Sequence, residues 1–311
     1  MENTSVRQRL LEQLVKTGAI RVRNDANDAP FWYTSGQPGP FYINVEKVAG
    51  QSAVVSMLEE INRILAAPDE SADKAQQVWQ LITEHLKNDQ EYRDTIALMV
   101  DYYRSLRPNQ PTLISGGERR DWFFSIPFAQ MLGLPHLFLL KNGGHWLVDT
   151  NGHPLDFGVH GASVLHVADI VNTASSYFRY WIPTLKQLDV QFHETVTAAV
   201  RNQDGVQALE QAGVHVITPL DMNPAVFSEA RTLGLISDFA FDEIKLYFES
   251  PQEWTRFLLR DSAAALLNGF PTLTAVDKAR MLSFMTQDPR GLRHEYPDFF
   301  NQAEILQGAQ L

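Results

Sequence analysis

The chain has 311 residues, of which 44% are apolar and 20% are charged, so it is long enough for one large domain or for one domain with an appendage. Its formal net charge of −11 argues against broad nucleic-acid binding, and an anionic ligand therefore needs a local cluster of basic side chains. The absence of cysteine excludes disulfides, thiolate catalysis and cysteine-ligated metals. The N-terminus is too polar for a secretory signal and no apolar run is long enough to span a membrane, so we expect a cytoplasmic protein.

The first fifty residues predict a helix and then an aromatic segment. Apolar side chains recur at helical spacing over residues 5–17. In the segment that follows, residues 31–33 and 41–45 are typical of two strands, joined by the turn Ser35–Pro40. Two interpretations stay open. The segment is a β-hairpin flap with buried aromatics, or its aromatics wall a site for a flat ligand.

Residues 51–107 predict helix almost throughout. Three amphipathic stretches are separated by polar breaks near 68–71 and 88–91. This is more helix than one connection between neighbouring strands requires. We therefore expect an inserted helical hairpin at about residues 68–92.

Residues 112–218 alternate between strand and helix patterns. The expected strands are short apolar runs at residues 112–115, 136–140, 164–168, 195–200 and 214–218. Such alternation predicts an α/β fold with a doubly wound, mostly parallel sheet, in which Val164–Ala168 is a central strand. Ligands of such sheets bind at the carboxyl ends of the strands.

The most informative stretch is Ala162–Ser176. Its apolar strand is followed by Asp169 and then by a turn of small and hydroxyl residues: Thr173, Ala174, Ser175 and Ser176. The N–H groups of such a turn and of the helix after it can hold a phosphate, and the carboxylate can accept hydrogen bonds from sugar hydroxyls. The pattern therefore predicts a phosphosugar site, although hydroxyl residues also serve simply as helix caps.

Two other segments of the sheet region carry candidate site residues. After the strand at 112–115, Gly116 and Gly117 let backbone approach a ligand, and Arg119 and Arg120 supply the forked donors that phosphate prefers; solvated arginines in an ordinary loop are the alternative. The polar, glycine-rich residues 141–161 are typical of a mobile lid. Their histidines are too spread out to favour a metal site.

Residues 221–311 predict a helical C-terminal extension. Asn223 and Ser250 each precede a proline, an arrangement typical of the first turn of a helix, and Thr274 stands before another helical stretch. The phenylalanine and tryptophan content indicates packing against the rest of the chain or against a partner subunit.

Four stretches, in order, resemble orotate phosphoribosyltransferase and the wider type I phosphoribosyltransferases. LLEQLVKTGAI followed by FWYTSGQPGPFYINVEKV is similar to the family's opening helix and substrate hood, and GGERRDW to its pyrophosphate loop. VLHVADIVNTASS is similar to the phosphoribosyl-pyrophosphate (PRPP) signature, and AAVRNQDGVQALEQAGVHVITPL to the closing segment. The resemblance covers about residues 10–220 and implies a phosphoribosyltransferase-like domain over 1–220, with a hood at 19–50.

The resemblance also implies roles for matching residues. Asp169 would bind the ribose hydroxyls and the Mg²⁺ that accompanies PRPP, and the turn Thr173–Ser176 would hold the 5′-phosphate. Residues expected to bind substrate elsewhere are Gly116, Gly117, Arg119, Phe41, Tyr42 and Asn44, the last three in the base pocket. Those expected to act in catalysis are Asp169, Arg120, Lys141 and His145. The family precedent is a homodimer.

The sequence departs from the family pattern at charged positions. Ala168 stands where the first of two acids is usual, and Leu140 and Thr34 stand where the family has basic residues. One lost charged contact at such a site costs on the order of 3 kcal/mol, roughly a hundredfold in rate. Two functions therefore stay open. The first is a divergent transferase that moves ribose 5-phosphate from PRPP to a nitrogenous base and releases pyrophosphate. The second is a weak or inactive relative that binds PRPP or a nucleotide in a regulatory or partner-binding role.

Overall fold

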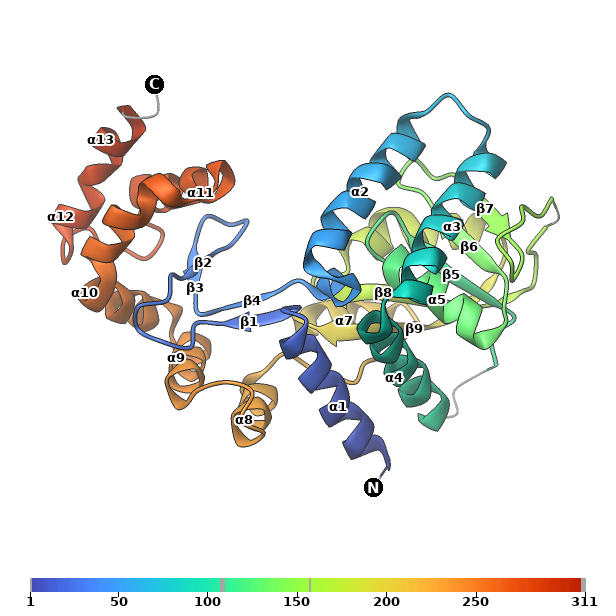
Figure 1. Cartoon of the computed structure of the whole chain (residues 1–311), viewed down its shortest axis with the longest axis horizontal. Coiled ribbons are helices and arrows are strands. Elements are labelled where there is room, and N and C mark those ends of the chain that lie inside the picture. The colour runs from blue at the N-terminus through green and yellow to red at the C-terminus, as the bar shows by residue number, and fades with distance from the viewer. Residues whose placement is uncertain (1, 107–109, 157, 309–311) are drawn as a thin grey trace. The chain divides into compact units, whose positions relative to one another are not determined.

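The computed structural model describes residues 2–106, 110–156 and 158–308, and the chain divides into two compact units. Unit 1 comprises residues up to 19 together with 44–222 (Figure 1). Unit 2 comprises residues 20–43 together with those from 223 onward. The units therefore do not follow chain order, because most of the segment expected as a hood groups with the C-terminal helices.

Unit 1 is an α/β unit. Its helical elements are α1 (Glu2–Lys16), the 3₁₀ helix η1 (Val45–Ala49), α2 (Gln51–Ala66), α3 (Ser71–Asn88), α4 (Gln90–Leu106), α5 (Trp122–Leu132), the π-helix η2 (Tyr177–Trp181), α6 (Ile182–Gln187) and α7 (Gln203–Gln211). Its strands are β5 (Leu113–Gly117), β6 (His136–Leu139), β7 (His145–Val148), β8 (Ser163–Val171), β9 (Gln191–Val200) and β10 (His215–Ile217).

The six strands form one sheet in the order β10-β9-β8-β5-β6-β7, and only the β6–β7 pair is antiparallel. The predicted parallel core is confirmed, and β8 is central, between β9 and β5. The prediction of a lid over residues 141–161 is wrong for His145–Val148, which joins the sheet as β7. Three of its four residues are buried, so it is held by packing as well as by the strand ladder.

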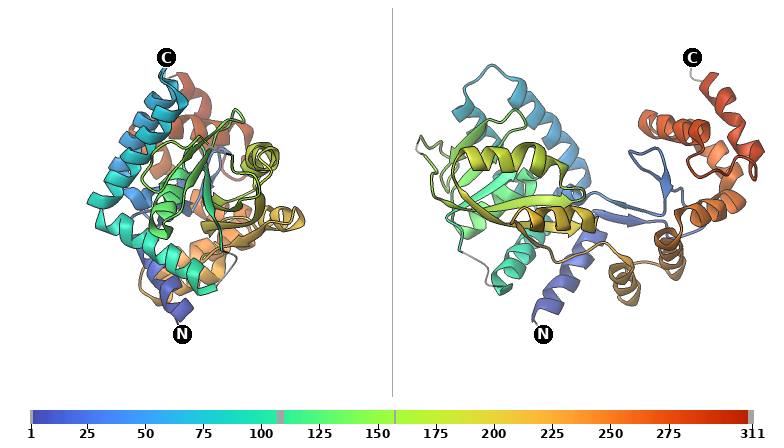
Figure 2. Two further views of the ribbon diagram at one scale, coloured as in Figure 1. Left: turned by 90° about the vertical axis from the view of Figure 1, so that its right-hand side faces the viewer. Right: turned by 180° about the vertical axis from the view of Figure 1, so that it is seen from behind.

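Helices cover both faces of the sheet (Figure 2). α3 and α4 pack on α5, which lies against β5 and β8. The other face carries η2 with α6, and α7, which packs on β10. The predicted helix breaks are confirmed, since Ala67–Glu70 separates α2 from α3 and Asp89 separates α3 from α4. A sheet covered on both faces explains why Val164–Ala168 of β8 is buried without a break.

Unit 2 begins with two small antiparallel pairs. β1 (Ile20–Val22) pairs with β4 (Phe41–Ile43), and β2 (Phe31–Trp32) pairs with β3 (Pro38–Gly39). The predicted pairing of 31–33 with 41–45 is therefore wrong. The Tyr33 ring occupies the space where Gly39 lacks a side chain, and its hydroxyl donates to the Phe41 carbonyl at 2.6 Å. The second strand therefore begins at Pro38, three residues earlier than the expected strand at 41–45.

The remainder of unit 2 is helical, as expected. It contains α8 (Pro224–Thr232), α9 (Asp238–Glu249), α10 (Pro251–Gly269), the 3₁₀ helix η3 (Phe270–Thr272), α11 (Ala275–Gln287), α12 (Pro297–Phe300) and α13 (Gln302–Gly308). The expected caps are confirmed, because the side chains of Asn223, Ser250 and Thr274 accept hydrogen bonds from the first turns of α8, α10 and α11.

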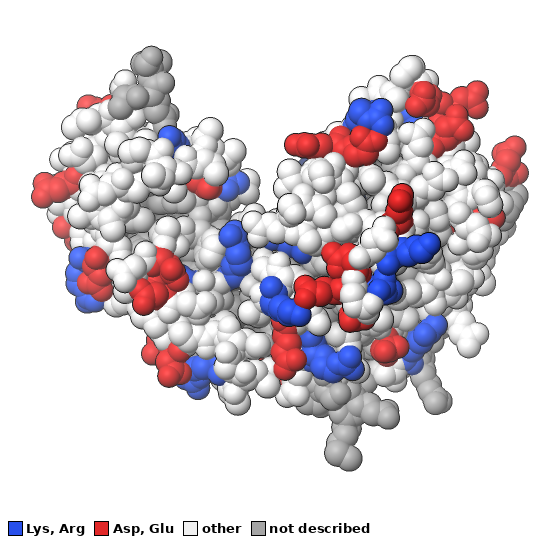
Figure 3. Space-filling model, in the orientation of Figure 1, with Lys and Arg blue, Asp and Glu red and all other residues white. Residues whose placement is uncertain are grey.

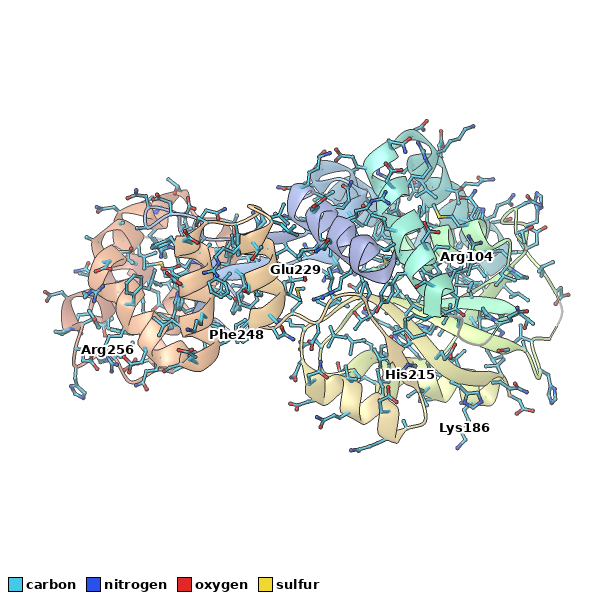
Figure 4. The ribbon with its side chains drawn as sticks, turned by 90° about the horizontal axis from the view of Figure 1, so that it is seen from below. Arg104, Lys186, His215, Glu229, Phe248 and Arg256 are labelled. Atoms are coloured by element: carbon cyan, nitrogen blue, oxygen red, sulfur yellow. The ribbon has the colours of Figure 1, made fainter. Side chains whose placement is uncertain are left out.

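Unit 2 has its own core, which joins its two chain segments. Trp32 packs with aromatic and aliphatic side chains of α10 and α11, among them Trp254 and Phe284. Phe248, labelled in Figure 4, stacks on Phe41 with ring centroids 5.6 Å apart. No helix in the described part of the chain is both long and apolar enough to cross a membrane.

Candidate functional site

The candidate site lies where β5 and β8 end side by side. The two strands are parallel neighbours, so the loops that follow them emerge at the same edge of the sheet. Glu118–Asp121 connects β5 to α5, and Asn172–Ala174 connects β8 to the helical residues that begin at Ser175. Both loops line one cavity of about 510 Å³. The two candidate loops therefore meet at the carboxyl edge of the sheet.

Polar and charged groups dominate the cavity wall. It includes Asn62, Glu118, Arg119, Arg120, Asp121, Lys141, Asp169, Asn172, Thr173, Ser175 and Ser176, with Leu58, Ala168, Ile170, Ala174, Tyr177 and Trp181 as its apolar and aromatic members. Figure 3 shows acidic and basic side chains interleaved on the face of unit 1 turned to the viewer. A cavity with both signs of charge suits a ligand that carries phosphate and hydroxyl groups together.

The turn after β8 has a backbone suited to holding an anion. Ala174 has φ of 54°, the left-handed region that glycine favours, and its methyl group is buried in the core. Thr173 and Ser175 are exposed on either side of it. α7 approaches this turn so closely that a Cβ on Gly205 would lie 2.0 Å from the Asn172 carbonyl oxygen. Gly205 therefore fixes the turn from behind, which accounts for a glycine in the closing segment.

Asp169 lies half-buried at the end of β8 and is linked to Asp121. The backbone N–H of Asp169 donates to Asp121 Oδ1 at 3.0 Å, and the N–H of Gly117 donates to Oδ2 at 3.0 Å. The Asp121 carboxylate thus joins the ends of β5 and β8. Burial, the Asp121 carboxylate and the Glu46 carboxylate raise the pKa of Asp169 well above its ordinary value.

A fully buried histidine on β8 adjoins this pair of acids. His166 Nδ1 lies 3.0 Å from Ser115 Oγ, and its Nε2 lies 3.6 Å from Asp121 Oδ2, beyond hydrogen-bond distance. Within the described part of the chain this Nε2 has no hydrogen-bond partner. On β6, burial and the nearby His166 lower the pKa of His136 to about 3, so that ring is neutral.

Three basic side chains line the cavity, and they differ in whether they form an ion pair within the described part of the chain. Arg120 Nε lies 3.1 Å from Glu46 Oε1, an ion pair between the turn after β5 and η1. Lys141 follows β6, and its backbone N–H donates to Glu118 Oε2 at 3.0 Å. Neither the Lys141 ammonium nor the Arg119 guanidinium forms a hydrogen bond or an ion pair with any described residue.

Several residues expected in the site are placed elsewhere. His145 begins β7 and lines a different cavity, with Leu155 and Leu188. Gly116 and Gly117 are inside β5 and are explained by protein contacts, because a Cβ on Gly117 would lie 2.3 Å from the Trp181 ring and one on Gly116 would lie 2.0 Å from Ser125 Oγ. These glycines were expected to let a ligand approach the backbone. In the structure, the space beside them is occupied by the side chains of Ser125 and Trp181.

The residues expected in the base pocket have the following contacts. Phe41 is buried among Phe227, Tyr247 and Phe248 of unit 2. Tyr42 stacks on Phe31 with ring centroids 6.0 Å apart. Asn44 belongs to unit 1, and with its amide nitrogen turned toward Glu46 it donates to that carboxylate. Their role in binding a base stays a prediction.

Sequence reasoning missed Asp121 and Glu46. Asp121 follows the two arginines, but nothing in the local pattern reveals that its side chain reaches the N–H of Asp169, forty-eight residues later. Glu46 is nearly fully buried, which is unusual for a glutamate. A glutamate next to a lysine in the sequence is expected to be exposed, so the local pattern does not reveal this burial. The described residues hold no group of three or more His, Cys, Asp or Glu side chains placed to bind a metal ion.

No family model matches the sequence, and no curated protein matches it. Solved structures do resemble the fold. UMP synthase from Leishmania donovani has 13% sequence identity and a TM-score of 0.49, and the match covers 77% of this chain but only 41% of that chain. Orotate phosphoribosyltransferase from Francisella tularensis has 13% identity and a TM-score of 0.46, covering 76% of this chain and 96% of that one. Adenine phosphoribosyltransferase from Thermoanaerobacter pseudethanolicus has 15% identity and a TM-score of 0.35, covering 45% and 86%. At these identities the likeness concerns the fold alone.

Proposed function

We propose that unit 1 binds PRPP and transfers its ribose 5-phosphate to a nitrogenous base of the orotate type, with release of pyrophosphate. The observation that carries this proposal is the meeting of two loops at one cavity. One loop offers a small-residue turn backed by Gly205, and the other offers arginines next to paired carboxylates. A phosphorylated sugar with a second anionic group needs both.

Each part of the ligand has a counterpart in the cavity. The 5′-phosphate fits the turn Thr173–Ser176, where exposed hydroxyls and the start of a helix supply donors. Ribose hydroxyls can donate hydrogen bonds to the carboxyl oxygens of Asp169, which lines the cavity. The pyrophosphate group faces the basic side chains of the turn after β5 and of Lys141.

In the reaction, a base nitrogen forms a bond to the anomeric carbon, the bond from that carbon to the pyrophosphate oxygen breaks, and the proton on the nitrogen passes to water or to the departing pyrophosphate. The products are a nucleotide and pyrophosphate, whose developing charge the basic side chains would stabilise. Oxygen ligands suit Mg²⁺, which usually takes one or two carboxylates and completes its shell with phosphates and water. Asp169, with Asp121 beside it, fits that donor set; the bound ion would neutralise pyrophosphate charge.

A second function, binding without turnover, is favoured by one observation. The chain after β6 makes a tight turn, in which the Leu140 N–H donates to the Gly144 carbonyl at 3.0 Å, and it passes directly into β7. His145 is therefore tied into the sheet and lines another cavity. The basic residues among the described ones that line the proposed site are therefore Arg119, Arg120 and Lys141, without His145.

Calorimetry together with an activity assay distinguishes three cases: transfer, binding without turnover, and neither. PRPP, orotate and orotidine monophosphate are titrated into the protein with and without Mg²⁺, and turnover of PRPP with orotate is assayed in parallel. We expect PRPP binding, with turnover well below the roughly 10 per second of a typical enzyme. Binding without any turnover supports the second function, and the absence of binding by all three ligands rejects both.

A further inference from the structure

Arg119 and Arg120 are adjacent in the turn after β5, but they have different partners. Both line the cavity. Arg120 is paired with Glu46, with 3.1 Å between its Nε and Oε1, whereas the Arg119 side chain has no hydrogen bond or ion pair among the described residues. The different contacts of Arg119 and Arg120 therefore indicate that the two arginines have different roles.

The partner of Arg120 is a buried carboxylate. The Glu46 side chain is only 3% exposed. Its carboxylate also accepts a hydrogen bond from the amide of Asn44, the residue that precedes η1. A buried carboxylate that loses its cationic partner is strongly destabilising, since the charge stays out of water without compensation. The Arg120 side chain is itself 60% exposed, but its Nε is paired with Glu46, which ties the position of Arg120 to η1.

Lys141 is arranged in the opposite way. Its backbone N–H is bound by Glu118, which fixes the position of the residue, while its exposed side chain has no ion pair among the described residues. Arg119 and Lys141 come from the ends of the neighbouring strands β5 and β6. Two uncommitted cations at one cavity wall form a place for an anion that carries more than one charge.

We propose that Arg119 and Lys141 bind the pyrophosphate group of the ligand, and that Arg120 is a positioning residue that holds Glu46 and η1 in place. This rests on the proposed function. It reverses the assignment implied by the family resemblance, in which Arg120 is the basic residue of the pyrophosphate loop. The Arg119 fork can bind two phosphate oxygens at once, and Lys141 adds a point charge.

The test measures inorganic pyrophosphate binding by calorimetry and thermal unfolding of the full chain. Arg119→Gln should weaken pyrophosphate binding by about tenfold or more at unchanged Tm. Arg120→Gln should lower Tm by about 4 °C and change the affinity by less than about threefold. Matched controls are Arg104→Gln and Lys186→Gln, exposed basic residues of unit 1 that do not line the cavity (Figure 4).

A double variant shows whether the lower Tm of Arg120→Gln comes from loss of the ion pair with Glu46 or from poorer packing of the new side chain. Glu46→Gln combined with Arg120→Gln should recover most of the lost Tm, because two neutral amides can bond to each other. The proposal is overturned if Arg119→Gln binds pyrophosphate as wild type does, or if Arg120→Gln keeps its Tm and loses affinity. Should the wild type bind neither pyrophosphate nor PRPP, the proposed function and the ligand half of this inference fail together, and the Tm values still decide the role of Arg120.

Discussion

Both units bury charged side chains, but they balance them differently. In unit 2, Arg23 is 1% exposed and all three of its nitrogens have partners, including Glu243 and the carbonyls of Ala26 and Asp28. In unit 1, three carboxylates (Glu46, Asp121 and Asp169) share one paired cation, Arg120, and the cavity keeps two further cations uncommitted. The buried arginine of unit 2 is fully paired within the protein, whereas the unpaired cations at the cavity of unit 1 are available to a ligand.

The carboxylates of the two units make the same contrast. Burial raises the pKa of Glu243 to about 7, although Arg23 lies against it. Burial and two neighbouring acids raise the pKa of Asp169. In unit 2 a cation lies against the buried carboxyl group and offsets part of the cost of burial. In unit 1 the neighbouring acids add to that cost, which is the pattern of a site that loses stability in return for binding.

The largest expected effect breaks the closed pair of unit 2. Arg23→Met should destabilise unit 2 by about 3–5 kcal/mol, because the buried Glu243 carboxyl group and the carbonyls of Ala26 and Asp28 lose their hydrogen-bond donor. Hydrogen exchange read by mass spectrometry should show faster exchange in α9 and α10 and unchanged exchange in β8. The control is Arg260→Met, which removes an exposed pair with Asp261 and should leave exchange in α9 and α10 close to that of wild type. Equal protection in the two variants would contradict the account.

The second effect concerns the phosphate turn of unit 1. Gly205→Ala should cost about 1–3 kcal/mol through overpacking against the Asn172 carbonyl, even though alanine favours the helix. It should also weaken PRPP binding, since the turn has to shift. Gly158→Ala is the control, because a Cβ there has no neighbour within 4 Å. Urea unfolding and calorimetry give both numbers, and a stabilised Gly205→Ala with normal affinity would show that α7 does not fix the turn.

The third and smallest effect concerns the open charge of unit 1. The folded pKa of Asp169 is raised, so its contribution to stability is complete below its ordinary value of 3.8 and is lost as pH rises through the folded pKa. Asp169→Asn cannot ionise, and it should therefore be more stable than wild type at pH 7 by about 1 kcal/mol, with no difference near pH 3. PRPP binding should weaken at the same time. A lower Tm of the variant at pH 7 would refute this reading.

Local patterns were sufficient to predict the parallel sheet, the turn Thr173–Ser176 and the arginine-bearing loop, because each depends on residues adjacent in sequence. Pairings between distant segments could not be predicted. The contact of Asp121 with Asp169 and the ion pair of Glu46 with Arg120 exist only once the sheet has formed. Two predictions failed for the same reason, since neither the β2–β3 pairing nor the place of His145 in β7 is specified by local composition.

The turn is better tested by substitution at Ser175 than at Ala174. The Ala174 methyl group is buried in the core at positive φ, so a bulky residue there would disturb the fold along with the site. Ser175 is exposed at the start of the helical residues. Ser175→Asp adds a negative charge where a helix N-terminus tolerates it, and Ser175→Asn is a neutral control of the same shape.

The central claim is that this turn holds the phosphate of a ribose 5-phosphate ligand, and calorimetric titration of PRPP into wild type and these two variants tests it most directly. We predict that wild type and Ser175→Asn bind PRPP within about threefold of each other, whereas Ser175→Asp binds at least about tenfold more weakly at an unchanged Tm, because like charges repel. Equal PRPP affinity in Ser175→Asp and wild type would contradict the claim.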